Sequence, residues 1–421
     1  MSNHAYESAA ALRPSSNGPI PISTLCERFS LAPASAEDAA ALNDLSILGV
    51  SVDSADTAPG ELFVGLPGFT VHGARFAADA VASGAVAVLT DADGAQIVHQ
   101  TAPGTPVLVH SDPRAVVGPL SAEVYHHPAR GLVTTAVTGT NGKTTTAYFL
   151  DAILSAHVGG CMVAGTVELR VGERSVESPR TTVEAPVLQR MMALAVEDKV
   201  GAASLEASSH AIVLHRLDGI VVDVAGFTNL QRDHLDFHKT MEGYLEAKAQ
   251  LFTPEHARRG VVCVDDQWGA ALAAEAPIEI DRVRAYPGET PADWWVSDAA
   301  VSLTDSATTF TLHGPDGEKI EASCPLPGLV NVQNAALALV MAIRAGVPAA
   351  TAAAALAGAH NIPGRMQRIS QRDGRRGLCI VDFAHTPDAM ELALKAVRPI
   401  TPGRLIVVFG SDGDRDQGKR P

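Results

Sequence analysis

The stretch Leu132–Leu154, LVTTAVTGTNGKTTTAYFLDAIL, decides the fold of the middle of this chain. It opens with an apolar, β-branched run and closes in a helical pattern, and a turn containing Gly142, Lys143 and Thr144 joins the two. Small residues let backbone N–H groups approach phosphate oxygens, and a helix N-terminus adds a positive dipole. A Lys suits terminal phosphates and a hydroxyl suits Mg²⁺. The stretch therefore predicts a phosphate-binding loop between a strand and a helix.

The spacing of this loop departs from the strict pattern GxxxxGK[ST], because Val137 stands where the first Gly would be. A glycine-containing turn with an incidental lysine is the alternative interpretation, and the loop alone leaves it open.

Outside the loop, apolar runs such as GIVVDVAGF and GVVCVD alternate with helical patterns, which predicts an α/β fold with a mostly parallel sheet. At roughly 150 residues per domain, 421 residues suggest about three domains. We expect a flexible arm at 1–19, a small α/β domain at 20–128, a central domain at 129–360 and a third domain at 361–421. The third domain has predicted strands LCIVDFA and LIVVFG around a helix, and we expect it to be incomplete at its C-terminus.

Composition and charge limit the class of protein. The 32 basic residues against 47 acidic ones give a net charge of −15, which argues against a nucleic-acid-binding protein. The N-terminus has no cationic start followed by an apolar core, and no stretch approaches 18 apolar residues, so we predict no signal peptide and no membrane span. The five cysteines lie far apart without a CxxC pair. These observations predict a cytoplasmic protein with reduced thiols.

Polar residues follow two of the predicted strands. Glu206 lies where the first of these strands would end, and His234 follows the second. Ligands of open α/β sheets gather at the carboxyl ends of strands. HLDFH lacks the Glu of HExxH, and EASSH lacks the glycines of GxSxG, so neither a metalloprotease nor a nucleophile elbow is indicated. Considered together with the phosphate loop, Glu206 and His234 are better interpreted as Mg²⁺-binding groups. The residues around Lys248, considered by themselves, favour a solvated lysine on the face of a helix.

Eight motifs occur in order over residues 51–421: TGTNGKTTT, EASSHA, FTNLQRDHLDFH, AK..LF, LPGLVNVQNA, PGRMQRI, VDFAHTPDAME and VFGSDGDRDQGKRP. Together they resemble the Mur ligases, the ATP-dependent amide ligases of peptidoglycan precursor synthesis. The segment SVDSADTAPGELFVGLPGFTVHGARF is similar to the uridine-binding domain of the MurE branch, which adds the third residue to UDP-N-acetylmuramoyl-L-alanyl-D-glutamate. The resemblance implies three domains: a UDP-binding domain, a P-loop-type ATPase domain and a partial Rossmann-like domain.

The resemblance also implies roles for individual residues. ATP would be bound by Gly139, Thr140, Asn141, Gly142, Lys143, Thr144, Thr145, Asn331, Asn334, Arg365, Asp382 and His385. The UDP-sugar peptide would be bound by Ser54, Phe69, Thr70, Val71, Thr181, Thr182, Ser208 and Arg216. Two Mg²⁺ ions would be held by Thr144, Glu206, His234 and a CO₂-derived carbamate on Lys248. Lys143, Lys248, Glu206 and His234 would form the catalytic set, and Arg415 would bind the incoming amino acid.

The implied reaction is formation of an acyl phosphate from ATP and the D-Glu carboxylate, followed by attack of an amino-acid amine. GDRD-x-GKRP resembles the enzymes that add meso-diaminopimelate more than those that add L-lysine, which remains the alternative. Folylpolyglutamate synthase is a rival that lacks the UDP-binding domain, and a catalytically inactive UDP-sugar- or nucleotide-binding fragment is a rival from another class. The family expectation is a monomer acting on small molecules.

Overall fold

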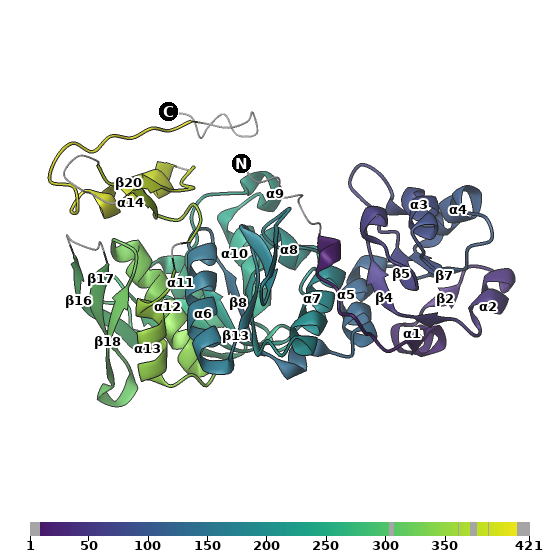
Figure 1. The fold of residues 1–421 in the computed structure, drawn as a ribbon, viewed down its shortest axis with the longest axis horizontal. Coiled ribbons are helices and arrows are strands. Elements are labelled where there is room, and N and C mark those ends of the chain that lie inside the picture. Colours follow the sequence, from purple (N-terminus) through teal and green to yellow (C-terminus); the bar gives the residue numbers. More distant parts are fainter. Residues whose placement is uncertain (1–8, 303–306, 361, 371–376, 386, 411–421) are drawn as a thin grey trace. The chain divides into compact units, whose positions relative to one another are not determined.

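The computed structural model describes residues 9–302, 307–360, 362–370, 377–385 and 387–410 (Figure 1). The chain forms two compact units. The first unit comprises residues 1–134, 160–223 and 253–258, and the second comprises 135–159, 224–252 and 259–421. Each unit is described by itself below.

The N-terminal part of the first unit is a five-stranded sheet with the order β2-β7-β6-β5-β4. Strands β4 to β7 pair in parallel and β2 pairs antiparallel with β7. The strands are β2 (Ala32–Pro33), β4 (Gly49–Ser51), β5 (Glu61–Val64), β6 (Ala87–Thr90) and β7 (Val107–Val109). The strands predicted in ELFVGL and VAVLTD are thus confirmed.

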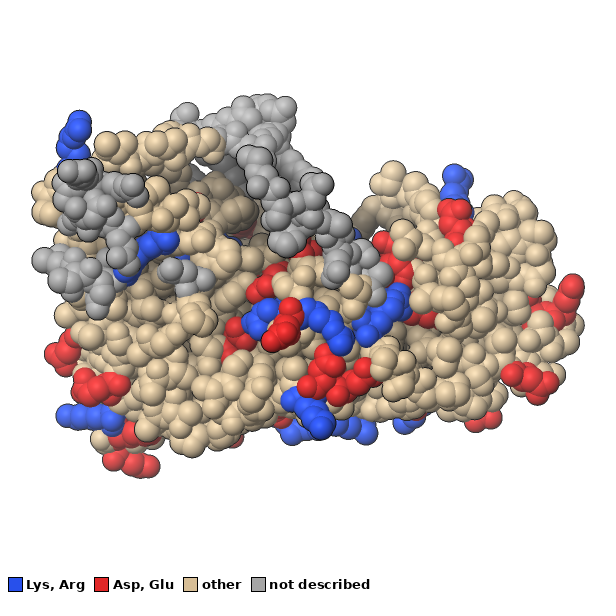
Figure 2. Space-filling model, viewed as in Figure 1, with Lys and Arg blue, Asp and Glu red and all other residues tan. Residues whose placement is uncertain are grey.

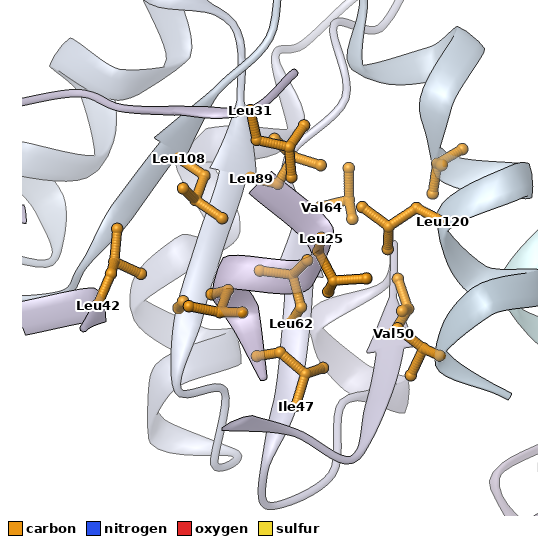
Figure 3. Packing of buried hydrophobic residues seen from close by; sticks show 14 of the residues in the cluster. Leu25, Leu31, Leu42, Ile47, Val50, Leu62, Val64, Leu89, Leu108 and Leu120 are labelled. Atoms are coloured by element: carbon orange, nitrogen blue, oxygen red, sulfur yellow. The ribbon is translucent and has the colours of Figure 1, made fainter. Parts of the chain in front are cut away.

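Side chains alternate between the two faces of this sheet, as the period of two in a strand requires. Leu62, Val64 and Leu89 pack in one cluster with residues of α1 (Ile22–Phe29) and α5 (Pro113–Val124) (Figure 3). Phe63 and Val88 face the other way and pack against α3 (Ala77–Ala82) and α4 (Ala92–Thr101). Helices on both faces explain why the middle residues of these parallel strands are apolar on both sides of the sheet. Helix α2 (Ala36–Leu42) follows β2, and a short pair joins β1 (Ile20–Pro21) to β3 (Ser46–Ile47).

The segment before this sheet differs from the flexible arm that we expected at 1–19. Residues Ala9–Ala11 form a 3₁₀ turn, and Leu12 is completely buried. The Asn17 amide donates hydrogen bonds to the carbonyls of Leu48 (2.7 Å) and Val124 (2.9 Å). The polar composition was misleading, because one buried leucine and a few side-chain hydrogen bonds are enough to fix residues 9–17. Residues 1–8 lie outside the described residues.

The rest of the first unit supplies a second parallel pair, β9 (Cys161–Ala164) with β12 (Ala202–Glu206). An antiparallel hairpin, β10 (Glu168–Val171) and β11 (Arg174–Glu177), extends from β9. Helices α7 (Ala185–Glu197) and α8 (Ser209–Val213) precede and follow β12. Glu206 is the last residue of β12, which confirms its predicted place at a strand end.

The second unit is built around β8 (Val133–Thr138), which pairs in parallel with β13 (Val222–Phe227). Helix α6 (Lys143–Val158) follows β8 and packs against α12 (Leu329–Arg344) and α13 (Ala349–Ala357). Three further helices follow β13 in the chain: α9 (Leu235–His238), α10 (Met241–Ala249) and α11 (Gln267–Glu275).

Parallel pairing continues through β14 (Ala257–Cys263), β15 (Glu279–Arg284) and β16 (Trp294–Val301). Strands β17 (Thr308–His313) and β18 (Lys319–Cys324) then add an antiparallel extension. The predicted sheet did not include this extension.

The C-terminal part of the second unit contains the antiparallel pair β19 (Gln367–Ser370) and β20 (Cys379–Val381), and helix α14 (Pro387–Val397). Residues 405–410, LIVVFG, are not a strand, so that prediction was wrong. A strand needs a neighbouring backbone to accept its hydrogen bonds, and within the described residues none pairs with this segment. Ile406, Val407, Val408 and Phe409 are instead exposed, with Val408 at 96%.

Figure 2 shows one face of the molecule. Among the described residues on this face, acidic and basic side chains lie beside one another, and the basic side chains do not form a single stripe. In the described part of the chain, no helix combines the length and apolarity needed to cross a bilayer.

Candidate active site

The loop between β8 and α6 has the backbone geometry that phosphate binding requires. Gly139 and Gly142 have φ angles of +143° and +92°, a region that residues with a Cβ rarely adopt. A Cβ at Gly139 would lie 1.9 Å from Thr228 Oγ1. Helix α6 begins at Lys143, directly after Gly142, so the N–H groups of its first turn and the positive end of its dipole lie at this loop. The predicted arrangement of strand, loop and helix is confirmed.

Residues after β13 hold this loop in place. The Thr228 hydroxyl donates to the Asn141 carbonyl (2.6 Å), and Asn229 Oδ1 accepts from the Asn141 N–H (3.1 Å). Gln231 Oε1 accepts from the Asn141 side-chain amide (2.7 Å). Our site prediction did not single out Thr228, Asn229 or Gln231. Their position at the carboxyl end of an apolar strand was the available signal.

Lys143 folds back over the loop that precedes it. Its Nζ donates to the carbonyls of Gly139 and Thr140, both at 2.9 Å. The ammonium is therefore held where the loop curves, close to the N-terminus of α6.

Lys248 on α10 is buried rather than solvated, with an exposed fraction of 1%. The interpretation of this residue as a solvated lysine was wrong, because the loop after β8 and the Tyr244 ring cover it. Its Nζ donates to the Gly139 carbonyl (2.8 Å) and lies 4.5 Å from the centre of the Tyr244 ring. Burial lowers the pKa of Lys248 well below its ordinary value of 10.5, the nearby Lys143 charge lowers it further, and Asp233 opposes the shift. Lys143 and Lys248 thus meet at one carbonyl oxygen.

His234 precedes the short helix α9 and has a left-handed backbone conformation, with a φ angle of +54°. Its side chain is about half exposed, and its ring lies edge-on to Tyr244 with 6.2 Å between ring centroids. Tyr244 therefore contacts both His234 and Lys248, and links two predicted site residues within the second unit.

Glu206 is the centre of a hydrogen-bonded group in the first unit. Its carboxylate accepts from the Thr166 N–H (2.8 Å) and hydroxyl (3.0 Å), and Thr166 Oγ1 lies 3.2 Å from Thr181 Oγ1. The Thr182 hydroxyl donates to the Glu206 carbonyl (2.7 Å) and accepts from the Ser208 N–H (3.0 Å). The structure therefore brings together Thr181, Thr182 and Ser208, predicted to bind the sugar peptide, and Glu206, predicted to bind Mg²⁺.

Arg216 joins this group from the segment after α8. Its Nη1 donates to the Thr182 carbonyl (3.1 Å), and its Nε lies 3.0 Å from Glu184 Oε1. Burial lowers the pKa of Arg216 from its ordinary value, and the Glu184 carboxylate opposes this shift. Glu184 also contacts Arg180 (3.1 Å) and is a neighbour that the site prediction missed.

A pocket in the second unit collects residues from three distant parts of the sequence. Asn331 and Asn334 on α12 line it together with Arg365, Asp382 and His385. Asn334 Oδ1 is buried and has no hydrogen-bond partner among the described residues. Arg365 Nη2 donates to Thr144 Oγ1 (3.2 Å), and Asp382 Oδ2 accepts from the Met366 N–H (2.8 Å). The five residues lie together beside Gly142 and Thr145 of the phosphate loop.

A cavity of about 600 Å³ lies in the first unit. Ser54 and Val71, both predicted to bind the UDP-sugar, line this cavity. Phe69 and Thr70 belong to the same exposed loop, and the Phe69 ring is 90% exposed. Arg415 lies outside the described residues.

Two of the predicted Mg²⁺ ligands fit the ion by the chemistry of the side chains present, whereas His234 offers a ring nitrogen. Thr144 offers a hydroxyl and Glu206 a carboxylate, and oxygen ligands are the ones that Mg²⁺ prefers. Among the described residues, no three His, Cys, Asp or Glu side chains form a metal-binding group.

Comparison with known proteins places these features in one family. Three family models match the chain. The model described as "Mur ligase family, catalytic domain" matches residues 46–125. The model described as "Mur ligase middle domain" matches residues 137–342, and the one described as "Mur ligase, glutamate ligase domain" matches residues 364–421. The chain is 45% identical, over 377 residues, to UDP-N-acetylmuramoyl-L-alanyl-D-glutamate--2,6-diaminopimelate ligase of Streptomyces avermitilis, covering 90% of this chain and 73% of that relative. It is 42% identical to UDP-N-acetylmuramyl-tripeptide synthetase of Leifsonia xyli, covering 98% of this chain and 78% of that protein.

A solved structure of a UDP-N-acetylmuramoyl-L-alanyl-D-glutamate--2,6-diaminopimelate ligase is also similar. Its TM-score is 0.69 at 33% identity, and the match covers 89% of this chain and 75% of the solved one. The phosphate loop, the buried lysine and the three matched regions have one explanation: the chain belongs to the Mur ligase family, the ATP-dependent ligases of peptidoglycan precursor synthesis.

Proposed function

We propose that this chain joins meso-diaminopimelate to the D-Glu carboxylate of UDP-N-acetylmuramoyl-L-alanyl-D-glutamate, converting ATP to ADP and phosphate. The observation that carries the proposal is the meeting of Lys143 and Lys248 at the Gly139 carbonyl, beside the N-terminus of α6. The names of the relatives from Streptomyces avermitilis and Streptomyces coelicolor support the choice of substrates. We expect the enzyme to act as a monomer in the cytoplasm.

ATP binds with its phosphates against Gly139 to Thr145, where backbone N–H groups and the helix dipole meet negative charge. Lys143 neutralises charge on the transferred phosphoryl group. The adenine lies against Asn331 and Asn334, where the unpartnered Asn334 Oδ1 can accept a hydrogen bond from an amino group. Arg365, Asp382 and His385 contact the nucleotide from the C-terminal side of the same pocket.

Lys248 reacts with CO₂ as a neutral amine. Its nitrogen forms a bond to the carbon of CO₂ and releases one proton, which gives an anionic carbamate. Burial favours the neutral amine, since it lowers the pKa of this lysine. The Gly139 carbonyl and the Tyr244 ring fix the position of the nitrogen.

In the second unit, Thr144, His234 and the carbamate of Lys248 would hold Mg²⁺, and in the first unit Glu206 would offer a carboxylate for Mg²⁺ binding. When bound, the ions neutralise phosphate charge during phosphoryl transfer. The chain orients these ligands itself, because Thr166 fixes the Glu206 carboxylate and the left-handed backbone at His234 directs its ring toward Tyr244.

The UDP-sugar peptide binds in the first unit through Ser54, Phe69, Thr70, Val71, Thr181, Thr182, Ser208 and Arg216. The guanidinium of Arg216 attracts a peptide carboxylate, and Glu184 and the Thr182 carbonyl hold it in one orientation. The D-Glu carboxylate attacks the γ-phosphoryl group of ATP and ADP leaves. The amine of the amino acid then attacks the acyl phosphate, phosphate leaves, and the amine loses a proton.

The choice of meso-diaminopimelate over L-lysine depends on a second carboxylate. Diaminopimelate carries a distal carboxylate that suits bidentate recognition by Arg, whereas lysine presents an ammonium that an Arg-lined pocket repels. Arg415 is expected to bind the carboxylate that both amino acids share, so it does not discriminate between them.

The test supplies the protein with ATP, UDP-N-acetylmuramoyl-L-alanyl-D-glutamate and each amino acid at equal concentration, and follows phosphate release and product mass. We expect phosphate release coupled to incorporation of meso-diaminopimelate. Preferential incorporation of L-lysine would overturn the choice of amino acid. Binding of UDP-sugar and ATP without any amide product would instead support the inactive binding protein.

A further inference from the structure

Four charged side chains of alternating sign form a chain of ion pairs in the first unit. Arg190 Nη1 on α7 lies 2.7 Å from Asp56 Oδ2, and Asp56 Oδ1 lies 3.3 Å from Arg13 Nη2. Arg13 Nη1 then pairs with Glu61 Oε1. Arg190 and Glu61 are buried, and Asp56 and Arg13 are largely covered. Two arginines from distant parts of the sequence therefore contact one loop, residues 53–61.

Arg13 contacts this loop at Asp56 and at its last residue, Glu61. Its Nη2 also donates to the Asp56 carbonyl, while its Nη1 holds the carboxylate of Glu61 at the start of β5. The second carboxylate oxygen of Glu61 accepts from the Ala58 N–H (2.9 Å). Removal of Arg13 leaves Glu61 buried without its cation and frees the segment between Asp56 and Glu61.

This loop is a wall of the 600 Å³ cavity. Ser54, Asp56 and Arg190 line the cavity, and so does Ala9 of the N-terminal segment. Asp53 stabilises the turn that presents Ser54, since its Oδ1 accepts from the Ala55 N–H (3.0 Å). The arginines thus act on the part of the cavity wall that carries a proposed UDP-sugar contact.

Contacts on both sides of Arg13 in the sequence hold the backbone of the segment Ala9–Asn17 in place. Leu12 is buried beside Arg13, and the Ala9 carbonyl accepts from Arg190 Nη2 (2.7 Å). On the other side, Ser15 Oγ donates to the Glu197 carboxylate (2.7 Å). A side chain anchored on both sides loses little further freedom when it holds the loop.

A second observation indicates that Arg190 does more than pack in the core. Its Nε is buried and has no hydrogen-bond partner among the described residues. Native proteins leave few buried donors unpaired, because each one costs stability. A buried arginine with an unpaired donor beside a cavity is better explained by what it holds in place than by stability.

We propose that Arg13 and Arg190 are positioning residues for the UDP-sugar substrate, and that the segment Ala9–Asn17 is part of the substrate site. The inference rests on the proposed function, which places the UDP-sugar in this cavity. The two guanidiniums each hold a different carboxylate oxygen of Asp56 and fix the loop that carries Ser54 before the substrate arrives. Neither residue takes part in phosphoryl transfer.

The experiment compares Arg13→Gln and Arg190→Gln with the parent protein in steady-state assays that vary the UDP-sugar dipeptide and ATP separately. We expect the KM for the UDP-sugar dipeptide to rise about tenfold, with kcat and the KM for ATP changed less than about twofold. Arg28→Gln is the matched control, because Arg28 pairs with Glu123 on the surface of the same unit. It should leave all three constants unchanged.

Calorimetry with UDP, together with thermal unfolding, separates the possible outcomes. An unchanged KM for the UDP-sugar dipeptide in both variants overturns the inference alone, provided that the parent protein binds UDP. A parent protein that binds neither UDP nor the dipeptide precursor overturns the proposed function and the inference with it. Equal rises in the KM for ATP and for the UDP-sugar dipeptide would show that the effect is not specific to the UDP-sugar and would also overturn it. Should Arg13→Gln fail to fold, Arg13→Lys decides, with an expected rise of about threefold, since Lys retains the charge but contacts fewer oxygens.

Discussion

Replacing Gly142 by Ala tests whether the phosphate loop and Asn334 form one nucleotide site. Gly142 has a φ angle of +92°, and a Cβ built there would lie 2.3 Å from Asn334 Oδ1. A left-handed conformation costs a residue with a Cβ about 1–2 kcal/mol. Carbon–oxygen contacts are normally more than about 3 Å long, so the Asn334 amide must move by roughly 1 Å.

The effect on ATP binding follows from that displacement. A well-placed hydrogen bond contributes about 0.5–1.5 kcal/mol net, and 1.4 kcal/mol corresponds to tenfold in Kd. We therefore expect Gly142→Ala to weaken ATP binding about tenfold, and to lower the free energy of unfolding by about 1–2 kcal/mol. Asn334 Oδ1 has no partner among the described residues, so its displacement adds little to the loss of stability without nucleotide.

Gly346→Ala is the matched control. Gly346 has a similar φ angle of +98°, but no heavy atom lies within 4 Å of the Cβ that Ala would add. It should lose about the same 1–2 kcal/mol of unfolding free energy while keeping the parent Kd for ATP. Calorimetric titration with ATP and urea unfolding of both variants measure the two quantities. An unchanged Kd for ATP in Gly142→Ala, or an equal loss of ATP affinity in Gly346→Ala, would refute the reasoning.

Three further predictions concern the two lysines and one histidine. Lys143→Ala should abolish ATP-dependent ligation while UDP binding in the first unit stays within about twofold, because the lysine lies at the phosphate loop; calorimetry that shows equal loss of both ligands would contradict this separation. Lys248→Ala should also be severely impaired, with partial rescue of phosphate release by added short-chain carboxylic acids that replace the carbamate; an unmodified Lys248 by mass spectrometry together with no rescue would count against carbamylation. Burial lowers the pKa of His256 below its ordinary value of 6.5, against the opposing effect of Asp218, so the unfolded chain takes up a proton that the folded chain does not. Stability should therefore fall as the pH drops below about 6.5, and less steeply in His256→Gln; urea unfolding between pH 7 and pH 5 would show identical slopes if this reasoning is wrong.

The phosphate loop could be predicted from sequence because its determinants are local. The β-branched run, the two glycines and the helix that begins at Lys143 all lie between Val133 and Val158, and each favours the same structure. Glu206 was placed correctly for a similar reason, since an apolar run predicts where its strand ends.

The burial of Lys248 could not be predicted in this way. The carbonyl that it contacts belongs to Gly139, which is 109 positions earlier in the chain. Nothing in YLEAKAQLF distinguishes a lysine beneath a distant loop from one facing water. The same holds for Arg13, whose partners Asp56 and Glu61 are more than 40 positions away. LIVVFG shows the opposite error, because local strand propensity was strong and no neighbouring strand pairs with it in the described residues.

The anchoring of the N-terminal segment also has a consequence for synthesis on the ribosome. Ser15 is bound by Glu197, which is translated 182 residues later. At about 5–20 residues per second, the segment emerges roughly 10 to 35 s before its anchor on α7 exists. Ser15 therefore lacks this anchor while the five-stranded sheet of β2 and β4 to β7 is already complete on the ribosome. An affinity tag fused at the N-terminus would act during this interval, so tag position should alter the yield of folded protein.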